Sequence, residues 1–278
     1  MHLGIHTPSS SSHRRVRCRR GFTLVELLVV IGIIALLISI LMPALSKARD
    51  QANRTKCLSN MRQFMTAMIM YTNENKQWLP HCNWLALEQN GGPLYGTPGW
   101  LYKWGAVGSP FDGTKPDAVR ETSALWPLVK SHDLYKCPVQ MDVPFDPNAP
   151  SRSLSSFLMN GATCSYGSTT HPDWRITAFR SDAILIWEVD EAQGWWNDGS
   201  GFPYEGITKR HGKGGTIAGI DGHAEWMSRR DYRKEAEESD SNGIVAGNPW
   251  QNRLWCDPGD KQHGGASGHI AKIAGTDY

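Results

Sequence analysis

Four polar residues in the carboxyl-terminal half could carry metal or acid–base chemistry. His211 is followed after nine residues by Asp221 and Gly222, and His223 comes directly after that pair. His211 and Asp221 could converge at the base of a hairpin, with Glu188 on a neighbouring strand, and such residues act as metal ligands or general acids and bases. Against this, Asp-Gly is the preferred pair for a two-residue type I′ turn, and spacings such as H-E-x-x-H or D-x-D-x-D-G are absent. We therefore expect His211 to be structural, hydrogen-bonding the hairpin, with no metal and no cofactor.

The rest of the sequence offers no enzyme motif. It contains no G-x-S-x-G, no GxGxxG, no Gly-rich phosphate loop and no C-x-x-C pair, so no catalytic residue and no zinc ribbon is predicted. Five of the six cysteines lie beyond residue 21, and an odd number leaves at least one thiol free. The sequence does not choose a disulfide pairing among Cys57, Cys82, Cys137, Cys164 and Cys256.

The chain has twelve tryptophans, which could stack on sugars or fill the core. Trp100, Trp104, Trp195 and Trp196 are candidates for a stacking face, although core and interface filling is the commoner use of tryptophan. An alternative function is therefore a periplasmic or surface binding module for a glycan or a metal. Its working parts would be the Trp-rich segment 84–126 and the histidines.

The charge of the chain is unevenly distributed. The first 21 residues contain no acid and five arginines, which are Arg14, Arg15, Arg17, Arg19 and Arg20. Removing these five from the 29 basic residues leaves 24 against 27 acidic ones, a net charge of about −3. No basic stripe or basic helix remains, so nucleic acid is not expected as a partner.

An apolar run follows the arginines and extends from Phe22 to Leu45. Its 24 residues make a helix roughly 36 Å long, enough to cross a hydrocarbon core of about 30 Å. Because the arginines precede it, we expect the amino terminus in the cytoplasm and the body on the other side. A secretory signal peptide has a shorter core that ends in an A-x-A-like site, so a plain signal anchor is the stronger alternative.

Glu26 is the one charged residue of this run, and a carboxylate at the centre of a membrane helix costs on the order of 2.5–3.5 kcal/mol. A plain signal anchor does not explain why a charged residue lies in the membrane helix. The six residues GFTLVE, which end at Glu26, resemble the processing site of type IV prepilins and type II secretion pseudopilins. The resemblance implies a prepilin peptidase that cuts after Gly21 and methylates Phe22, and a filament in which Glu26 faces the amine of a neighbouring subunit. Pro43 lies where many of these proteins kink the helix.

A second resemblance links the end of the helix with the histidine motif. The segment CLSNMRQ at 57–63 is similar to the end of this helix in a branch of pseudopilin-like proteins that carry an H-x9-DG motif near the carboxyl end. His211, Asp221 and Gly222 supply that motif here, and the resemblance leaves its role unknown. Together the two resemblances cover residues 14–80 and 205–228.

Periodic patterns predict the elements that position these residues. Small and Met-rich side chains recur at three- and four-residue steps, as on a helix that lies on a sheet, at Leu45, Ala48, Ala52, Thr55, Leu58, Met61, Met65, Met68 and Thr72. We expect this helix to end near Asn75, a buried strand over 183–189, and a hairpin over 216–227 with the Asp-Gly turn. A long membrane-spanning helix packed on an antiparallel β-sheet is an α+β arrangement, in agreement with the pilin-like fold that the resemblance implies.

The expected organisation is a basic leader (1–21), a transmembrane helix (22–45), a periplasmic part of the same helix (46–78), a globular pilin-like head (79–228) and an irregular tail (229–278). The expected function is a structural pseudopilin-like subunit of a type II secretion or type IV pilus-like assembly, and not an enzyme. Expected partners are prepilin peptidase, other pseudopilin or pilin subunits and inner-membrane lipid. The expected location is the bacterial inner membrane, with a cytoplasmic amino terminus and a periplasmic head.

Overall fold

The structure is a computed structural model that describes residues 22–84, 96–105, 116–140, 151–167, 174–189 and 198–238, with positions 253, 254, 256 and 258. The chain divides into two compact units, Met1–Lys47 and Ala48–Tyr278, which are described separately. The described elements, in chain order, are α1 (Leu24–Glu74), α3 (Pro116–Arg120), α4 (Trp126–Val129), η2 (His132–Tyr135), α5 (Ser151–Leu154), β1 (Phe157–Asn160), η3 (Gly161–Gly167), η4 (Ile176–Ala178), β2 (Ile184–Glu188), β3 (Ser200–Gly201), η5 (Pro203–Glu205), β4 (Gly214–Gly219), β5 (Ala224–Ser228) and α6 (Arg229–Glu238).

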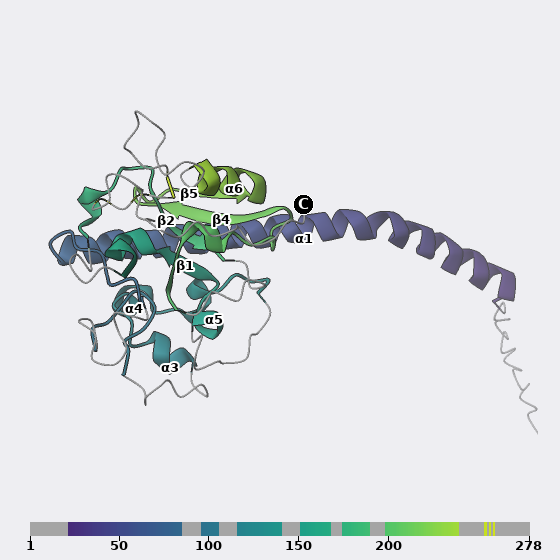
Figure 1. Ribbon diagram of the computed structural model, residues 1–278. Coiled ribbons are helices and arrows are strands. Elements are labelled where there is room, and N and C mark those ends of the chain that lie inside the picture. The colour runs from purple at the N-terminus through teal and green to yellow at the C-terminus, as the bar shows by residue number, and fades with distance from the viewer. Residues whose placement is uncertain are drawn as a thin grey trace, which may run out of the picture. The chain divides into compact units, whose positions relative to one another are not determined.

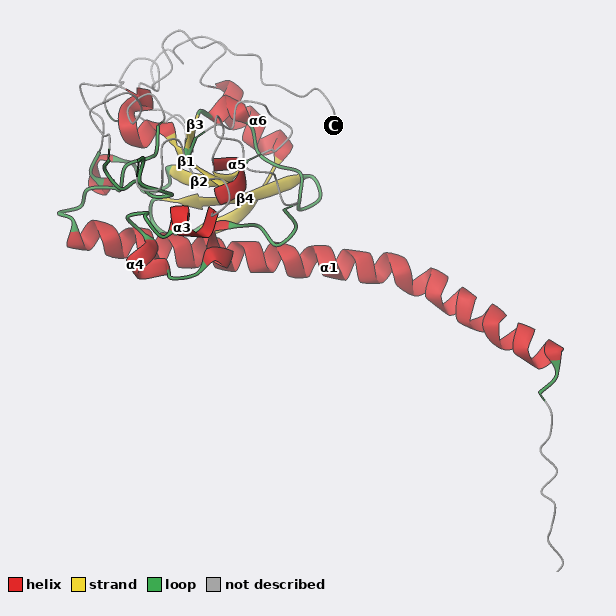
Figure 2. Ribbon diagram, turned by 90° about the horizontal axis from the view of Figure 1, so that it is seen from below, coloured by secondary structure: helices red, strands yellow, loops and turns green. Residues whose placement is uncertain are grey.

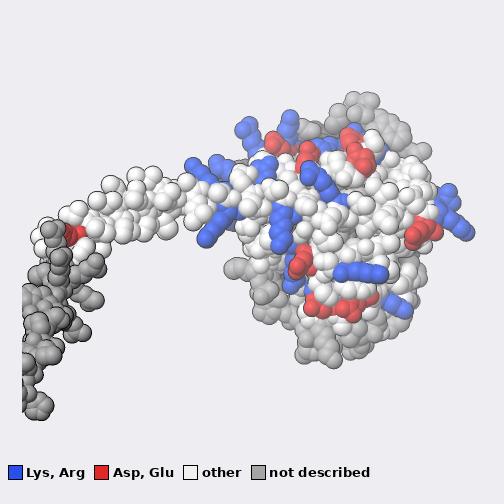
Figure 3. Space-filling view, turned by 180° about the vertical axis from the view of Figure 1, so that it is seen from behind, with Lys and Arg blue, Asp and Glu red and all other residues white. Residues whose placement is uncertain are grey.

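The first unit consists, in its described part, of the apolar beginning of α1. This helix contains Pro43 and starts directly after Thr23. Its large apolar side chains are exposed, and it is long and apolar enough to cross a membrane. In Figure 3 the surface of this stretch carries neither blue nor red apart from one acidic position near the start of the helix. The predicted membrane helix is therefore confirmed by length and composition.

A five-stranded sheet forms the centre of the second unit (Figure 1). The strand order is β3-β1-β2-β4-β5; the pairs β1–β2, β2–β4 and β4–β5 are antiparallel, and β1–β3 is parallel. The α+β class and the helix-on-sheet layout are confirmed, but the sheet is mixed, whereas the sequence predicts an antiparallel one. β3, which follows β2 in the sequence, lies at the outer edge of β1 and runs parallel to it.

Alternation along the strands sends side chains into two separate cores. On β1, Phe157 and Met159 belong to the core that includes α1, and Leu158 belongs to the other. On β4, Ala218 and Ile217 divide in the same way. Figures 1 and 2 both draw the sheet between α1 and α6, so each face of the sheet has its own helix. The predicted buried strand at 183–189 is confirmed as β2, which is buried at all of its residues.

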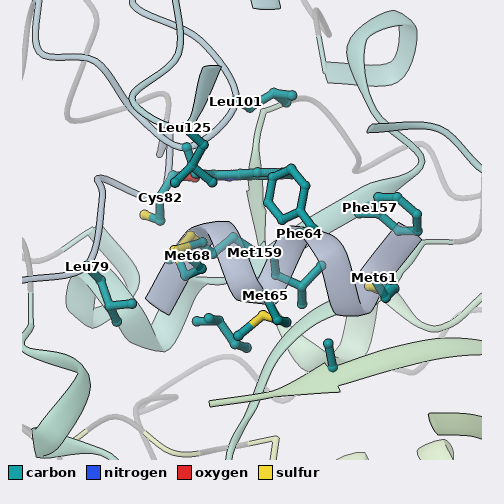
Figure 4. Packing of buried hydrophobic residues seen from close by; sticks show 14 of the residues in the cluster. Met61, Phe64, Met65, Met68, Leu79, Cys82, Leu101, Leu125, Phe157 and Met159 are labelled. Carbon is teal, nitrogen blue, oxygen red and sulfur yellow. The ribbon is translucent and has the colours of Figure 1, made fainter. Parts of the chain in front are cut away.

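The later part of α1 supplies the helix side of the first core. Its buried residues are Cys57, Asn60, Met61, Phe64, Met65, Ala67, Met68 and Thr72. Figure 4 shows Met61, Phe64, Met65 and Met68 within the cluster that also contains Phe157 and Met159 of β1. The predicted apolar stripe is confirmed from Leu58 onward, and it is wrong before that residue, because Leu45, Ala48, Ala52 and Thr55 are exposed.

The tail from Arg229, predicted to be irregular, begins instead with the ten-residue helix α6. Ser228 caps this helix: its hydroxyl accepts the amide N–H of Asp231 at 3.0 Å and donates to the Asp231 carboxylate at 2.6 Å. Tyr232 and Ala236 of α6 are buried in the second core. The capping signal and the two apolar positions are thus present in a segment whose high charge masks them.

Candidate functional site

The first candidate site is the start of α1, where the predicted processing and assembly residues lie. The amide and the hydroxyl of Thr23 both donate to Glu26 Oε2 at 2.8 Å, and the Glu26 amide donates to the Thr23 hydroxyl oxygen at 3.2 Å. This reciprocal capping box satisfies backbone groups that the beginning of a helix leaves without intrahelical partners. Glu26 therefore has a role within its own helix that requires no second chain.

The capping box uses one oxygen of the Glu26 carboxylate. Among the described residues, Glu26 Oε1 accepts no hydrogen bond. Phe22, one residue before the cap, is 71% exposed. Gly21 lies outside the described residues, so cleavage after Gly21 and methylation of Phe22 stay predictions.

The second candidate site is a buried group of four residues, which we name the His211 cluster. Its members are Cys57 on α1, Cys137 after η2, Glu188 at the end of β2 and His211 shortly before β4. Each offers one atom of a type that binds metals, these atoms all lie within 4.8 Å of one another, and all four residues are buried. Four segments distant in sequence thus bring together two sulfurs, one imidazole and one carboxylate.

His211 lies at the centre of the contacts within this cluster. Its Nε2 is 3.3 Å from Cys137 Sγ and 3.2 Å from Glu188 Oε1. Its Nδ1 is buried and has no hydrogen-bond partner in the described part of the chain. The ring therefore engages the cluster through Nε2.

Neighbouring groups hold these side chains in place. Glu188 Oε2 accepts from the amide of Thr216 at 2.8 Å and from its hydroxyl at 2.9 Å. Arg210 Nη1 lies 3.5 Å from Glu188 Oε1, and Thr216 Oγ1 lies 3.3 Å from Cys57 Sγ. The indole N–H of Trp226 donates to the carbonyl oxygen of His211 at 3.3 Å. Cys57, Glu188 and His211 are thus each contacted by a residue of β4 or β5.

Burial and mutual hydrogen bonds shift the ionisation of these groups. Burial alone would raise the pKa of Glu188, but the hydrogen bond and charge of His211, with the charge of Arg210, lower that pKa to about 2. Burial would lower the pKa of His211, and its hydrogen bonds with Cys137 and Glu188 raise it to about 9. A hydrogen bond with Cys57 lowers the pKa of Cys137 to about 7, whereas the same contact and burial raise the pKa of Cys57. Cys137 is therefore the more acidic of the two thiols.

Asp221 does not join His211. Its Oδ1 accepts from the amide of His223 at 3.0 Å and pairs with the Nδ1 of the same residue. The arrangement in which His211 and Asp221 share a site is contradicted, because most of the residues between them form β4. A six-residue strand extends about 20 Å, which carries Asp221 to the far end of the hairpin.

The turn at Asp221 also differs from the predicted type I′ geometry. The Gly219 amide donates to the His223 carbonyl, and the Gly222 amide donates to the Gly219 carbonyl, both at 3.0 Å. The loop therefore has three residues, 220–222, instead of two. Gly222 is at φ +89°, and Asp221 is not at positive φ. A turn followed by a left-handed glycine is the usual three-residue hairpin, and it suits Asp-Gly as well as the two-residue turn does.

The structure describes two of the four tryptophans that are candidates for a stacking face. Trp100 and Trp104 are buried, and Trp100 Nε1 donates to Gly199 O at 2.8 Å and to Cys82 O at 3.1 Å. These two rings therefore fill the core, which is the commoner use of tryptophan, and are not available to stack on a sugar. Trp195 and Trp196 lie outside the described residues.

The cysteines divide into a disulfide and a set of buried thiols. Cys82 is bonded to Cys164, while Cys57, Cys137 and Cys256 are buried and not disulfide-bonded. Sequence reasoning considered Cys57 and Cys137 only as disulfide candidates and missed their place beside His211. Their spacing gives no local signal, because they are 80 positions apart in the sequence.

Comparison with known proteins supports the prepilin-like resemblance of the amino-terminal segment. The family model for the prokaryotic N-terminal methylation motif matches residues 16–42. The chain is 38% identical over 64 residues to type II secretion system core protein G of Klebsiella michiganensis, which is 23% of this chain and 45% of that protein. It is 40% identical over 63 residues to the type IV wide pilus major component of Thermus thermophilus, which is 23% of this chain and 48% of that protein.

A further relative is the type IV major pilin protein of Myxococcus xanthus, 29% identical over 77 residues, or 28% of this chain and 35% of that protein. The chain thus spans less than half the length of these curated relatives. No solved structure matches it significantly. The matches support the type IV prepilin-like family and a membrane-anchored, pilin-type protein. The H-x9-DG resemblance is not tested by them.

Proposed function

We propose that this chain is a structural pilin-like subunit, made as a precursor and anchored in the bacterial inner membrane by α1. The observation that carries the proposal is the match of residues 16–42 to the N-terminal methylation motif. That segment contains Gly21 and the start of the exposed apolar helix. Prepilin peptidase cuts after Gly21 and methylates Phe22 in this proposal, and the chain itself is not an enzyme.

Two features support a cytoplasmic amino terminus and a periplasmic head. The five arginines before α1 favour the cytoplasmic side for that end of the helix. The disulfide between Cys82 and Cys164 is typical of an oxidising compartment, such as the bacterial periplasm.

The similarity to a secretion pseudopilin and to pilins supports assembly with other pilin or pseudopilin subunits in a type II secretion or type IV pilus-like machine. In such an assembly Glu26 Oε1 accepts a hydrogen bond from the new amine of a neighbouring Phe22. Pairing these charges in a low-dielectric bundle offsets part of their desolvation and defines the axial register of the subunits.

Processing can be tested directly in cells that contain a prepilin peptidase. We expect mass spectrometry of the membrane-extracted protein to give an amino terminus at Phe22 carrying one methyl group. Gly21→Leu should leave the leader attached. Gly32→Leu is a matched control, because a Cβ added at Gly32 would meet nothing within 4 Å. Recovery of unprocessed wild-type protein, or of a mature Gly21→Leu variant, would contradict the proposal.

A further inference from the structure

We infer that the His211 cluster is a structural zinc site in which Cys57, Cys137, Glu188 and His211 each supply one ligand atom. This site is independent of processing and assembly at α1. The sequence predicts instead that His211 only hydrogen-bonds the hairpin and binds no metal.

The spacing of the ligand atoms fits a tetrahedral ion. With zinc–sulfur bonds of about 2.3 Å and zinc–nitrogen or zinc–oxygen bonds of about 2.0–2.1 Å, neighbouring ligand atoms are about 3.5 Å apart for sulfur and nitrogen and about 3.3 Å for nitrogen and oxygen. The distances from His211 Nε2 are 3.3 Å to Cys137 Sγ and 3.2 Å to Glu188 Oε1. Both distances are slightly shorter than the tetrahedral values, so these three atoms need to move apart only a little to admit the ion.

One nitrogen faces a sulfur and a carboxylate oxygen at short distance, and a metal ion would engage all three atoms together. His211 Nε2 carries at most one proton, which can point well toward either Cys137 Sγ or Glu188 Oε1 but not toward both. A cation between the three atoms binds all of them at once. The position of Cys57 Sγ, within 4.8 Å of each of these atoms, completes a set of four.

The hydrogen bonds around Glu188 favour metal binding through a single oxygen, Oε1. Thr216 donates two hydrogen bonds to Oε2, which leaves Oε1 directed at His211. Partners of this kind orient metal ligands in known sites. The charge also balances: two thiolates, one carboxylate and Zn²⁺ sum to −1, and the Arg210 guanidinium at 3.5 Å from Glu188 Oε1 contributes +1.

The ligand types and their burial identify the metal and its role. Two thiolates and an imidazole favour zinc over the hard cations calcium and magnesium, which prefer oxygen. Because all four residues are buried, no position is open for water or substrate, as in structural sites. The ion would join α1, the segment after η2, β2 and the approach to β4 at one point.

The first test is metal content of the full-length chain, purified in detergent without immobilised metals. We expect about one zinc ion per chain. His211→Gln and Cys137→Ser should lose most of it, whereas Cys256→Ser, at a buried cysteine outside the cluster, should keep it. Replacing zinc with Co²⁺ should give the visible absorption of a tetrahedral ion together with thiolate-to-cobalt charge-transfer bands, and both should disappear in His211→Gln.

The second test uses only the wild-type chain, so that it holds even where a variant fails to fold. A chelator should lower its melting temperature, and added zinc should restore it. Two results would overturn the inference: a reduced wild-type chain that takes up neither zinc nor Co²⁺, or a Cys57–Cys137 disulfide found by mass spectrometry in protein isolated with its thiols blocked.

Discussion

The Glu26 carboxylate accepts hydrogen bonds from both the amide and the hydroxyl of Thr23, and both bonds end on the same oxygen. Glu26 thus closes the start of α1 within its own chain and keeps Oε1 available for a second partner. Two contributions of this residue, helix capping and pairing with the amine of a neighbour, can therefore be separated by substitution.

Glu26→Gln should keep the capping box and lose the charge, because glutamine also serves at the third position of a helix. Glu26→Val removes both and should insert into the membrane at least as well as the wild type. If the charge pair sets the register, both variants should fail to enter filaments, as measured by crosslinking between subunits. Normal crosslinking of Glu26→Gln would show that capping, and not the charge, is what assembly requires.

Thr23→Ala provides the complementary change. It removes the hydroxyl from the cap and leaves the Glu26 charge in place, at an expected cost of about 0.5–2 kcal/mol to the start of the helix. Crosslinking should therefore remain close to wild type. A loss as complete as that of Glu26→Val would argue against the amine–carboxylate pair.

Gly222 has a conformation that few other residues tolerate. It is at φ +89°, and a Cβ at this position would lie 3.1 Å from Ile69 Cδ1. Gly222→Val should lower the free energy of unfolding by about 1–3 kcal/mol, because a β-branched residue is strained at positive φ. Thermal melting of the full-length chain in detergent measures this effect.

Gly222→Asn is the matched control, because asparagine enters the left-handed region several times more readily than most residues. It should recover a large part of the loss seen for Gly222→Val. Equal melting temperatures for the wild type and Gly222→Val would contradict the three-residue loop with its left-handed glycine.

The apolar helix and the strand β2 could be predicted because their signals are local. The apolar run, the one acid and the arginines are contiguous, and the strand at 183–189 is a single apolar segment. The sequence predicts the position of the hairpin but not its turn, since Asp-Gly suits loops of two or three residues. The helical stripe was extended too far because periodicity does not tell where the sheet begins to cover the helix.

The His211 cluster could not be predicted, since it depends on which distant segments meet. Cys57 and Cys137 join Glu188 and His211 only because α1 packs on one face of a sheet that contains β2 and β4. The H-x9-DG motif suggests a different partner for His211, Asp221, but the length of β4 places Asp221 at the far end of the hairpin. Strand order and the choice of face are set by the packing of the whole head.

Substitution of Trp100 tests whether this tryptophan stabilises the core. Its indole N–H serves two buried carbonyls, those of Cys82 and Gly199. Trp100→Phe leaves them without this donor and should cost about 1–3 kcal/mol of stability, measured by thermal melting. Trp78, which is 41% exposed, is the control, and Trp78→Phe should change little. A Trp100→Phe variant with unchanged melting but altered binding to a glycan array would favour the binding-module alternative.

Glu205 links the stability of the head to pH. Its side chain is buried, Oε2 has no hydrogen-bond partner among the described residues, and burial followed by the nearby charge of Asp198 raises its pKa well above the usual range. In the unfolded chain the carboxyl ionises near pH 4.5. Above that pH the folded state binds more protons than the unfolded state, so the contribution of Glu205 to stability is complete below about pH 4.5 and decreases as the pH rises.

The melting temperature of the wild-type chain should therefore include a fall as the pH rises above about 4.5, and Glu205→Gln should remove it. Because glutamine is neutral and similar in shape, this variant should be the more stable one at about pH 8, by about 2–4 °C for each kcal/mol recovered. Glu74→Gln, at an exposed acid at the end of α1, is the control and should follow the wild type at both pH values. Parallel pH profiles for the wild type and Glu205→Gln would mean that Glu205 ionises in the folded protein much as it does in the unfolded chain.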